Sequence, residues 1–283
     1  MTKTTLVTGA TGKTGAYTVP LLLELGHSVR AFVHKLDERS ERLAALGAEI
    51  VHGDLLALDR VRAALDGVDG AYFCYPIAPG LVEATAYFAQ AAKEASVGAI
   101  VNMSQISARS EAGSNAARQH WISERVLDWS GVPVTHLRPT FFAEWLTMLA
   151  NTFQADGVMR LPFGEGRHAP IAAADQARVI AAVLDDPAPH AGQIYKLFGP
   201  VEMDHHQIAA EMARVLDRPI RYEPIPVETF AATLRGRGMS DHIIQHLSNV
   251  AIDYQHGIFA GTNDVVERIG GAAGTTVAAF VAD

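Results

Sequence analysis

Short apolar stretches alternate with longer amphipathic segments through the first half of the chain. The stretch 70–75 is almost wholly apolar, which is typical of a strand covered on both faces of a sheet. Segment 81–96 has the alanine-rich pattern of a helix. Strand and helix in alternation predict an α/β fold built on a doubly wound parallel sheet. The expected strands are 5–8, 28–34, 49–52, 70–75, 99–103 and 134–138, and the expected helices are 16–26, 39–47, 60–65, 81–96 and 114–130.

The rhythm changes after residue 140. We expect an apolar helix at 141–149, a loop punctuated by glycine and proline at 156–168, and a helix and strand within 171–198. The remainder is mostly helical, with Asp204 as a helix cap; Asp59 is expected to cap an earlier helix. These patterns predict a nucleotide-binding domain at 1–155 and a smaller, mostly helical substrate subdomain at 156–283. Within the subdomain, 171–198 is expected to pack back on the sheet. The helices expected beyond residue 204 are 207–216, 229–237, 241–254 and 263–269.

A glycine motif joins the first strand to the first helix. Its spacing is G-x-x-G-x-x-G, in which glycine permits the sharp turn and the helix N-terminus faces a pyrophosphate, as in a Rossmann-type fold. An ATP-binding P-loop would need a glycine at position 7, which is Val7. A glycine-rich turn without a ligand stays an alternative. The expected cofactor-binding residues are Gly9, Thr11, Gly12, Lys13, Thr14 and Gly15.

The second strand ends where a dinucleotide's adenine ribose is expected. His34 and Lys35 follow it, and cations there suit a 2′-phosphate, so the sequence favours NADP over NAD. Asp37 and Glu38 keep NAD open. Later strand ends complete the expected cofactor site with Asp54 and Leu55, where Asp54 could bond the adenine amine or cap a turn, and with Tyr75 and Pro76.

Composition removes several other classes of protein. The net charge of −8, with no run of Lys and Arg, argues against nucleic-acid binding. No apolar stretch reaches the length of a membrane span, so we expect no membrane partner. The single cysteine, Cys74, fits a reducing compartment, and we expect a cytoplasmic protein. Cys74 is expected in the core rather than as a nucleophile, and adjacent His205 and His206 diverge on a helix, so no metal site is expected.

Carboxyl ends of parallel strands line the ligand crevice of such a sheet. Ser104 and Gln105 follow the fifth strand, and Ser104 could instead bond the local backbone. The apolar segment after the sixth strand can line a substrate pocket or simply pack. The expected substrate contacts are Gln105, Thr140, Phe141, Phe142 and Trp145.

Four segments in this order resemble the NmrA-like group of atypical short-chain dehydrogenases. They are the glycine motif, the turn Gly53-Asp54, the segment VPVTHLRPTFF at 132–142 and the segment GTNDVVERIG at 261–270. The resemblance covers nearly the whole chain. It implies NADP binding and reduction of a conjugated small molecule such as an enone, a quinone or an iminium-like dye. The group also contains regulators that bind NADP without turnover. A cofactor-neutral isomerase or cyclase stays open as well, as does a homo-oligomer.

The catalytic acid is the least determined part of the site. None of the seven tyrosines begins the Tyr-x-x-x-Lys motif of ordinary short-chain dehydrogenases. In isoflavone-reductase-like members of the group a lysine stands at the position of His120, and the triphenylmethane dye reductases resemble this chain in having histidine there. The resemblance therefore implies His120 as a proton donor, with Ser104 bonding the cofactor or a substrate oxygen. Alternatively, His120 is a partly exposed histidine whose charge Glu124 steadies.

Overall fold

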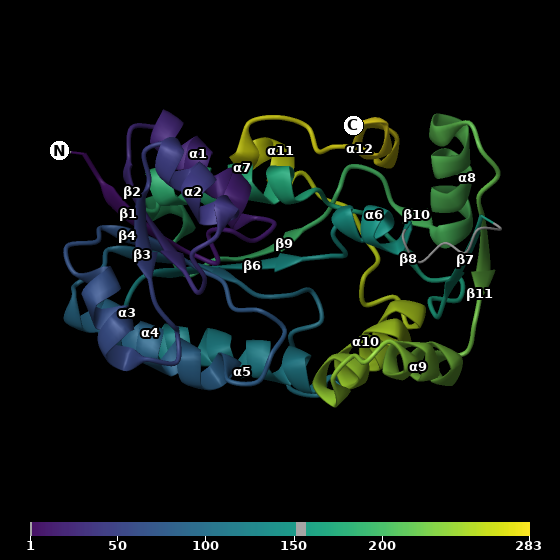
Figure 1. Ribbon diagram of the computed structural model, residues 1–283, viewed down its shortest axis with the longest axis horizontal. Helices are drawn as coiled ribbons and strands as arrows, with labels where there is room; N and C mark the ends of the chain where they lie inside the picture. The colour runs from purple at the N-terminus through teal and green to yellow at the C-terminus, as the bar shows by residue number, and fades with distance from the viewer. Residues whose placement is uncertain (1, 151–156) are drawn as a thin grey trace.

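The computed structural model describes residues 2–150 and 157–283. Its largest element is a seven-stranded parallel sheet in the order β3-β2-β1-β4-β5-β6-β9 (Figure 1). This confirms the Rossmann-like α/β fold. Its strands are β1 (Thr4–Thr8), β2 (Ser28–Val33), β3 (Glu49–His52), β4 (Gly70–Phe73), β5 (Ala99–Met103), β6 (Val134–Pro139) and β9 (Ile194–Leu197).

Helices cover both faces of the sheet, and neighbouring strand residues point into opposite layers. Leu6 packs on the face of α3, α4 and α5, whereas Val7 packs on the face of α1, α2, α7 and α11. Both faces are therefore shielded from water, which explains why β4 is buried at every position. The helices are α1 (Gly15–Glu24), α2 (Glu38–Ala45), α3 (Leu58–Leu65), α4 (Leu81–Glu94), α5 (Asn115–Ser130), α7 (Ala173–Asp185) and α11 (Val265–Gly270), with a 3-10 turn at Ala188–His190.

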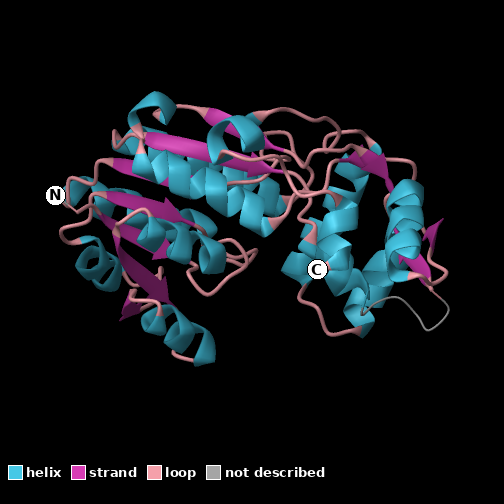
Figure 2. Cartoon of the chain, turned by 90° about the horizontal axis from the view of Figure 1, so that it is seen from above, coloured by secondary structure: helices cyan, strands magenta, loops and turns pink. Residues whose placement is uncertain are grey.

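A second group of elements encloses its own apolar core beside the sheet (Figure 2). Two small sheets belong to it, β8 with β10 antiparallel and β7 with β11 parallel. Strand β9 stays with the large sheet next to β6, and α7 packs on α1. The elements of the second group are α6 (Glu144–Ala150), β7 (Val158–Leu161), β8 (Arg167–His168), β10 (Met203–Asp204), α8 (His205–Leu216), β11 (Arg221–Pro224), α9 (Val227–Gly236), α10 (Asp241–Gln255) and α12 (Val277–Ala282).

Two local expectations are corrected by the structure. The segment expected as a loop at 156–168 contains β7 and β8, because β7 finds a partner more than fifty residues later, in β11. Asp156 itself, and the expected domain boundary at 155, lie outside the described residues. Asp59 does not cap α3. That helix follows Ala57 directly, and Asp59 lies in its first turn. The strand β11 and the helix α12 were not expected.

Other capping expectations are confirmed by hydrogen bonds. Asp204 begins α8 with a capping box, accepting from the Gln207 N–H at 2.8 Å while the Gln207 side chain accepts from the Asp204 N–H. Asp54 accepts from the Leu56 N–H at 2.9 Å and so shapes a turn. Among the described residues, no helix combines the length and apolar character needed to cross a bilayer.

Candidate active site

The glycine motif forms a tight loop between β1 and α1. Gly9 has a φ of 58°, and its carbonyl accepts from the Gly12 N–H at 2.8 Å. A Cβ on Gly15 would lie 2.3 Å from the Gly9 carbonyl oxygen, which no side chain tolerates. The N–H groups of Lys13 and Thr14 make no hydrogen bond within the described residues. Backbone donors left open at a helix N-terminus fit the pyrophosphate of a dinucleotide.

The side chains of this motif point in different directions. Thr14 is buried, and its hydroxyl lies 2.7 Å from the Tyr72 hydroxyl, so only its backbone faces outward. Lys13 is exposed, and Thr11 borders a pocket. Cys74 is partly buried against the core beside Gly9, and burial raises the pKa of its thiol, which fits a packing role.

The cations expected near the adenine ribose lie at the end of β2. His34 and Lys35 are exposed, and His34 Nδ1 is 4.0 Å from Asp54 Oδ2. The pocket bordered by Thr11 is also lined by Arg39 and Arg42, which the sequence analysis did not select. Their three-residue spacing on a helix directly after β2 was the available signal, because it places both on one face.

Asp37 is engaged within the protein. Its carboxylate caps α2 by accepting from the Arg39 N–H at 3.0 Å, and it also pairs with the Arg39 side chain, Oδ2 to Nη2, at 2.6 Å. These bonds engage Asp37, the acid that was a candidate partner for the ribose hydroxyls of NAD. The end of β2 therefore presents cations, while the nearby acid Asp37 is already hydrogen-bonded within the protein. This arrangement suits NADP.

The turns that follow β3 and β4 approach each other. A Cβ on Gly80 would lie 2.8 Å from the Tyr75 hydroxyl and 3.1 Å from the Leu56 side chain. Burial, and then the Asp54 carboxylate, raise the pKa of Tyr75. The Tyr75 hydroxyl donates to the Pro79 carbonyl at 2.9 Å, which orders the turn containing Pro76. Leu55 is half-buried against the core below this turn.

Two buried polar atoms at the end of β5 have no hydrogen-bond partner among the described residues. Ser104 is 4% exposed, and its hydroxyl has no hydrogen-bond partner among the described residues, so it does not bond the local backbone. Gln105 accepts from the Ser107 hydroxyl at 3.0 Å, but its Nε2 is buried and unpartnered. Such atoms cost about 1–3 kcal/mol each when nothing satisfies them. Together with the glycine cradle, they fit a bound cofactor and substrate.

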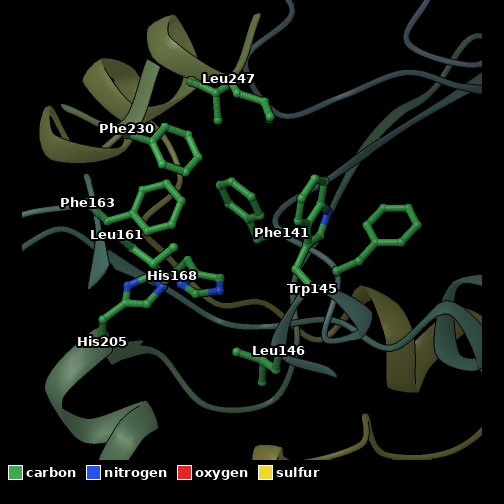
Figure 3. A pocket seen from close by; sticks show the side chains of 11 residues that line it. Phe141, Trp145, Leu146, Leu161, Phe163, His168, His205, Phe230 and Leu247 are labelled. Carbon is green, nitrogen blue, oxygen red and sulfur yellow. The ribbon is translucent and has the colours of Figure 1, made fainter. Parts of the chain in front are cut away.

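An aromatic pocket opens directly after β6 (Figure 3). Phe141 lies at its centre, with ring centroids 5.3 Å from Phe163 and 5.1 Å from Phe259. Thr140, in contrast, is buried, and its hydroxyl donates to the Phe259 carbonyl. The pocket is lined by Phe141, Phe142, Trp145, Leu146, Leu161, Phe163, His168, His205, Phe230, Leu247 and Val250.

His120 is buried rather than partly exposed. It is 4% exposed on α5, and burial lowers its pKa to about 4, so the imidazole is neutral at pH 7. Glu124 does not pair with it, because the Glu124 carboxylate holds the guanidinium of Arg138, Oε1 to Nε, at 2.8 Å. His120 is also not among the residues that line the aromatic pocket in the described chain.

No group of three or more His, Cys, Asp or Glu side chains in residues 2–150 and 157–283 is arranged to hold a metal ion. His205 is buried while His206 is exposed, as their adjacency on a helix requires. His205 instead meets His168 in the pocket wall. This pair could not be found from the sequence, because the two residues come from separate elements and no local pattern links them.

Comparison with known proteins agrees with this geometry. The chain is 30% identical over 275 residues to an NAD(P)H azoreductase of Xenophilus azovorans, covering 97% of this chain and 96% of that one. The crystal structure of an NADPH-dependent quinone oxidoreductase from Escherichia coli, complexed with NADPH, superposes with a TM-score of 0.88 at 26% identity and 98% coverage of both chains. A triphenylmethane reductase of Citrobacter sp., complexed with NADP(H), shares the fold with a TM-score of 0.86, 21% identity and 98% coverage of both chains.

The family profile reaches almost from end to end. It matches residues 1–268, from the first strand into helix α11. The glycine cradle, the strand order and the aromatic pocket all lie inside this match. The chain therefore belongs to the NmrA-like family.

Proposed function

We propose that the protein is an NADPH-dependent reductase of planar, conjugated small molecules such as quinones and azo or cationic dyes. One observation carries the proposal: the aromatic pocket begins at the carboxyl end of β6, beside the β5 end where the Ser104 hydroxyl and the Gln105 Nε2 have no partner among the described residues. Parallel sheets of this type bind the reactive end of a dinucleotide at such an edge. The names of the azoreductase and quinone oxidoreductase relatives support the same reaction class.

The chain's own residues bind and orient, while bound NADPH supplies the hydride. The open N–H groups of Lys13 and Thr14 receive the pyrophosphate, and His34, Lys35, Arg39 and Arg42 attract the 2′-phosphate. Those residues set cofactor choice. They lie on the half of the sheet away from the pocket, so cofactor choice and substrate choice are governed by different side chains.

Substrate contacts come from the strand ends and the pocket. Ser104 and Gln105 donate to the nicotinamide or to a substrate oxygen, and Phe141, Phe142 and Trp145 enclose the substrate ring. His120 is neutral, so its role is limited to an N–H hydrogen bond rather than transfer from an imidazolium. The substrate-binding role of the C-terminal subdomain, the cytoplasmic location and a homo-oligomer stay predictions.

The test is cofactor titration followed by turnover. Purified protein is titrated with NADPH and NADH by fluorescence, and NADPH oxidation is then followed at about 340 nm with quinones and azo dyes as acceptors. We expect tighter NADPH binding and acceptor-dependent oxidation. NADPH binding without oxidation by any acceptor would instead support an NADP-sensing regulator or a cofactor-neutral enzyme.

A further inference from the structure

One tyrosine hydroxyl joins two histidines behind the aromatic pocket. The Tyr254 hydroxyl lies 2.5 Å from His168 Nδ1 and 3.2 Å from His205 Nδ1. The three side chains come from α10, β8 and α8, and each is at most 3% exposed. The two imidazoles are nearly parallel, with centroids 5.5 Å apart, and both line the pocket (Figure 3).

A single hydroxyl proton constrains both rings. Tyr254 can donate to only one Nδ1, so it must accept from an N–H at the other. An imidazole that accepts at Nδ1 carries its proton on Nε2, whereas one that donates from Nδ1 has a bare Nε2. The two histidines are therefore held in opposite tautomers, and their Nε2 atoms are one donor and one acceptor.

We assign the Tyr254 hydroxyl as the donor to His168, at 2.5 Å, because O–H donors make shorter hydrogen bonds than N–H donors. The 3.2 Å contact is then His205 donating to Tyr254. His168 consequently carries an Nε2–H donor and His205 a bare Nε2 acceptor.

Neither ring is charged, and neither outer nitrogen is used. Burial lowers the pKa of His205 to about 3 and that of His168 well below its ordinary value, and burial raises the pKa of Tyr254. In residues 2–150 and 157–283, no hydrogen bond engages either Nε2. Both side chains line an otherwise apolar pocket, so a bound ligand can supply the partner that each Nε2 lacks.

We propose that His168 and His205 form the polar recognition element of the substrate pocket, with Tyr254 as the residue that sets their tautomers. The ligand is a neutral, planar aromatic whose carbonyl oxygen or azo nitrogen accepts from His168 Nε2. A hydroxyl or N–H on the ligand, such as that of a reduced product, donates to His205 Nε2. This inference rests on the proposed reductase function for the identity of the site, but its binding chemistry is independent of turnover.

The pocket adapts when it is filled. Its space open to a water-sized sphere is about 30 Å³, far below the ~150 Å³ cavity that accepts benzene. Side chains must therefore rotate, and Phe230 on α9 and Leu247 on α10 belong to the wall opposite Trp145 on α6 (Figure 3). Apolar contact drives ligand binding, and hydrogen bonds to His168 and His205 determine which aromatic ligand is retained.

The test compares two ligands of similar shape. Protein saturated with NADP⁺, which cannot transfer hydride, is titrated by calorimetry with 1,4-naphthoquinone and with naphthalene, which lacks any acceptor. For Tyr254→Phe and His168→Phe we expect naphthoquinone binding to weaken about tenfold, because the first no longer holds His168 in the tautomer with an Nε2–H and the second removes that donor. Naphthalene binding is expected to stay within about twofold. His168→Gln, whose amide can donate in place of Nε2–H, is expected to recover part of the affinity.

Each outcome separates the two proposals. Unchanged NADP⁺ affinity shows that a variant is folded. If Tyr254→Phe does not fold, the comparison of His168→Phe with His168→Gln is the test. Equal losses for both ligands would mean that the unit only supports the pocket wall, and no loss for either would also overturn the inference. Failure of the wild type to bind naphthoquinone, with NADPH oxidation by other acceptors intact, would overturn it and leave the reductase standing. Selective binding of naphthoquinone without oxidation of NADPH by any acceptor would support the histidine recognition element and overturn the reductase function.

Discussion

At the scale of single residues, the cofactor site depends on positions where a side chain must be absent. Gly15 begins α1 directly against the Gly9 carbonyl, and a Cβ there would come within 2.3 Å of that oxygen and 2.7 Å of Ala10 Cα. Both atoms belong to the backbone, so neither can rotate away. The helix N-terminus would have to move, and with it the N–H groups that face the pyrophosphate.

We expect Gly15→Ala to weaken NADPH binding by more than about tenfold and to lower the free energy of unfolding by about 2 kcal/mol. Fluorescence titration and urea unfolding measure the two effects. Gly236→Ala is the matched control, since Gly236 lies in α9 with nothing within 4 Å of an added Cβ. Normal NADPH affinity in Gly15→Ala would contradict the binding role of the loop.

We expect Arg39 to determine the preference for NADPH over NADH. It borders the pocket beside Thr11 and holds the Asp37 carboxylate. Arg39→Ala is expected to weaken NADPH about tenfold, because a charge-assisted phosphate contact is lost. NADH binding is expected to be unchanged or tighter, because Asp37 becomes free to accept from ribose hydroxyls. The ratio of the two dissociation constants is the measurement, with the exposed Arg118→Ala on α5 as control.

At the scale of elements, an ion pair ties the segment after β5 to helix α10. Arg109 contacts Asp253 through two bonds, Nη1 to Oδ2 at 2.8 Å and Nη2 to Oδ1 at 2.5 Å. The Asp253 side chain is 7% exposed and that of Arg109 26%, so this pair is screened less than a surface pair. It joins the strand end that carries Ser104 to the helix that carries Tyr254.

Asp253→Asn is expected to lower the free energy of unfolding by about 2 kcal/mol, because it leaves the guanidinium without its counter-charge. Urea unfolding followed by circular dichroism gives the value. Asp241→Asn, at the exposed start of the same helix, is expected to change it by less than about 0.5 kcal/mol. Equal effects from the two substitutions would show that the pair contributes little.

At the scale of the whole molecule, buried neutral histidines couple stability to pH. Burial lowers the pKa to about 4 for His120 and His246 and to about 3 for His205. Unfolded histidine binds a proton near pH 6.5, so below that pH the unfolded chain binds more protons than the folded one. Their contribution to stability is therefore complete above about pH 6.5 and is lost as the pH falls toward 4.

Each of these histidines is expected to cost on the order of 1 kcal/mol of stability between pH 7.5 and pH 5.5. Urea unfolding at the two pH values measures the sum. His246→Asn is expected to reduce this pH dependence, whereas replacement of the exposed His52 is expected to leave it unchanged. A pH dependence that His246→Asn does not alter would mean that His246 is protonated in the folded chain.

Local patterns in the sequence suffice to predict the sheet, the glycine loop and the nicotinamide class of cofactor. These are local properties: apolar stretches of strand length, glycines at a fixed spacing and cations just after β2 can be read over a few consecutive residues. The end of β6 was also identifiable, because Phe141 and Phe142 follow it directly.

Only the tertiary structure decided which side chains meet in the pocket. Strand β7 pairs with β11, and His168 meets Tyr254 and His205, across separations that no local pattern encodes. His120 is likewise neutral because it is buried on α5, which packs on α10. Glu124 does not offset this burial by pairing with His120, because its carboxylate pairs with Arg138. Burial and long-range hydrogen bonding depend on the packing of distant elements, and they set the charge and tautomer of the groups that face the substrate.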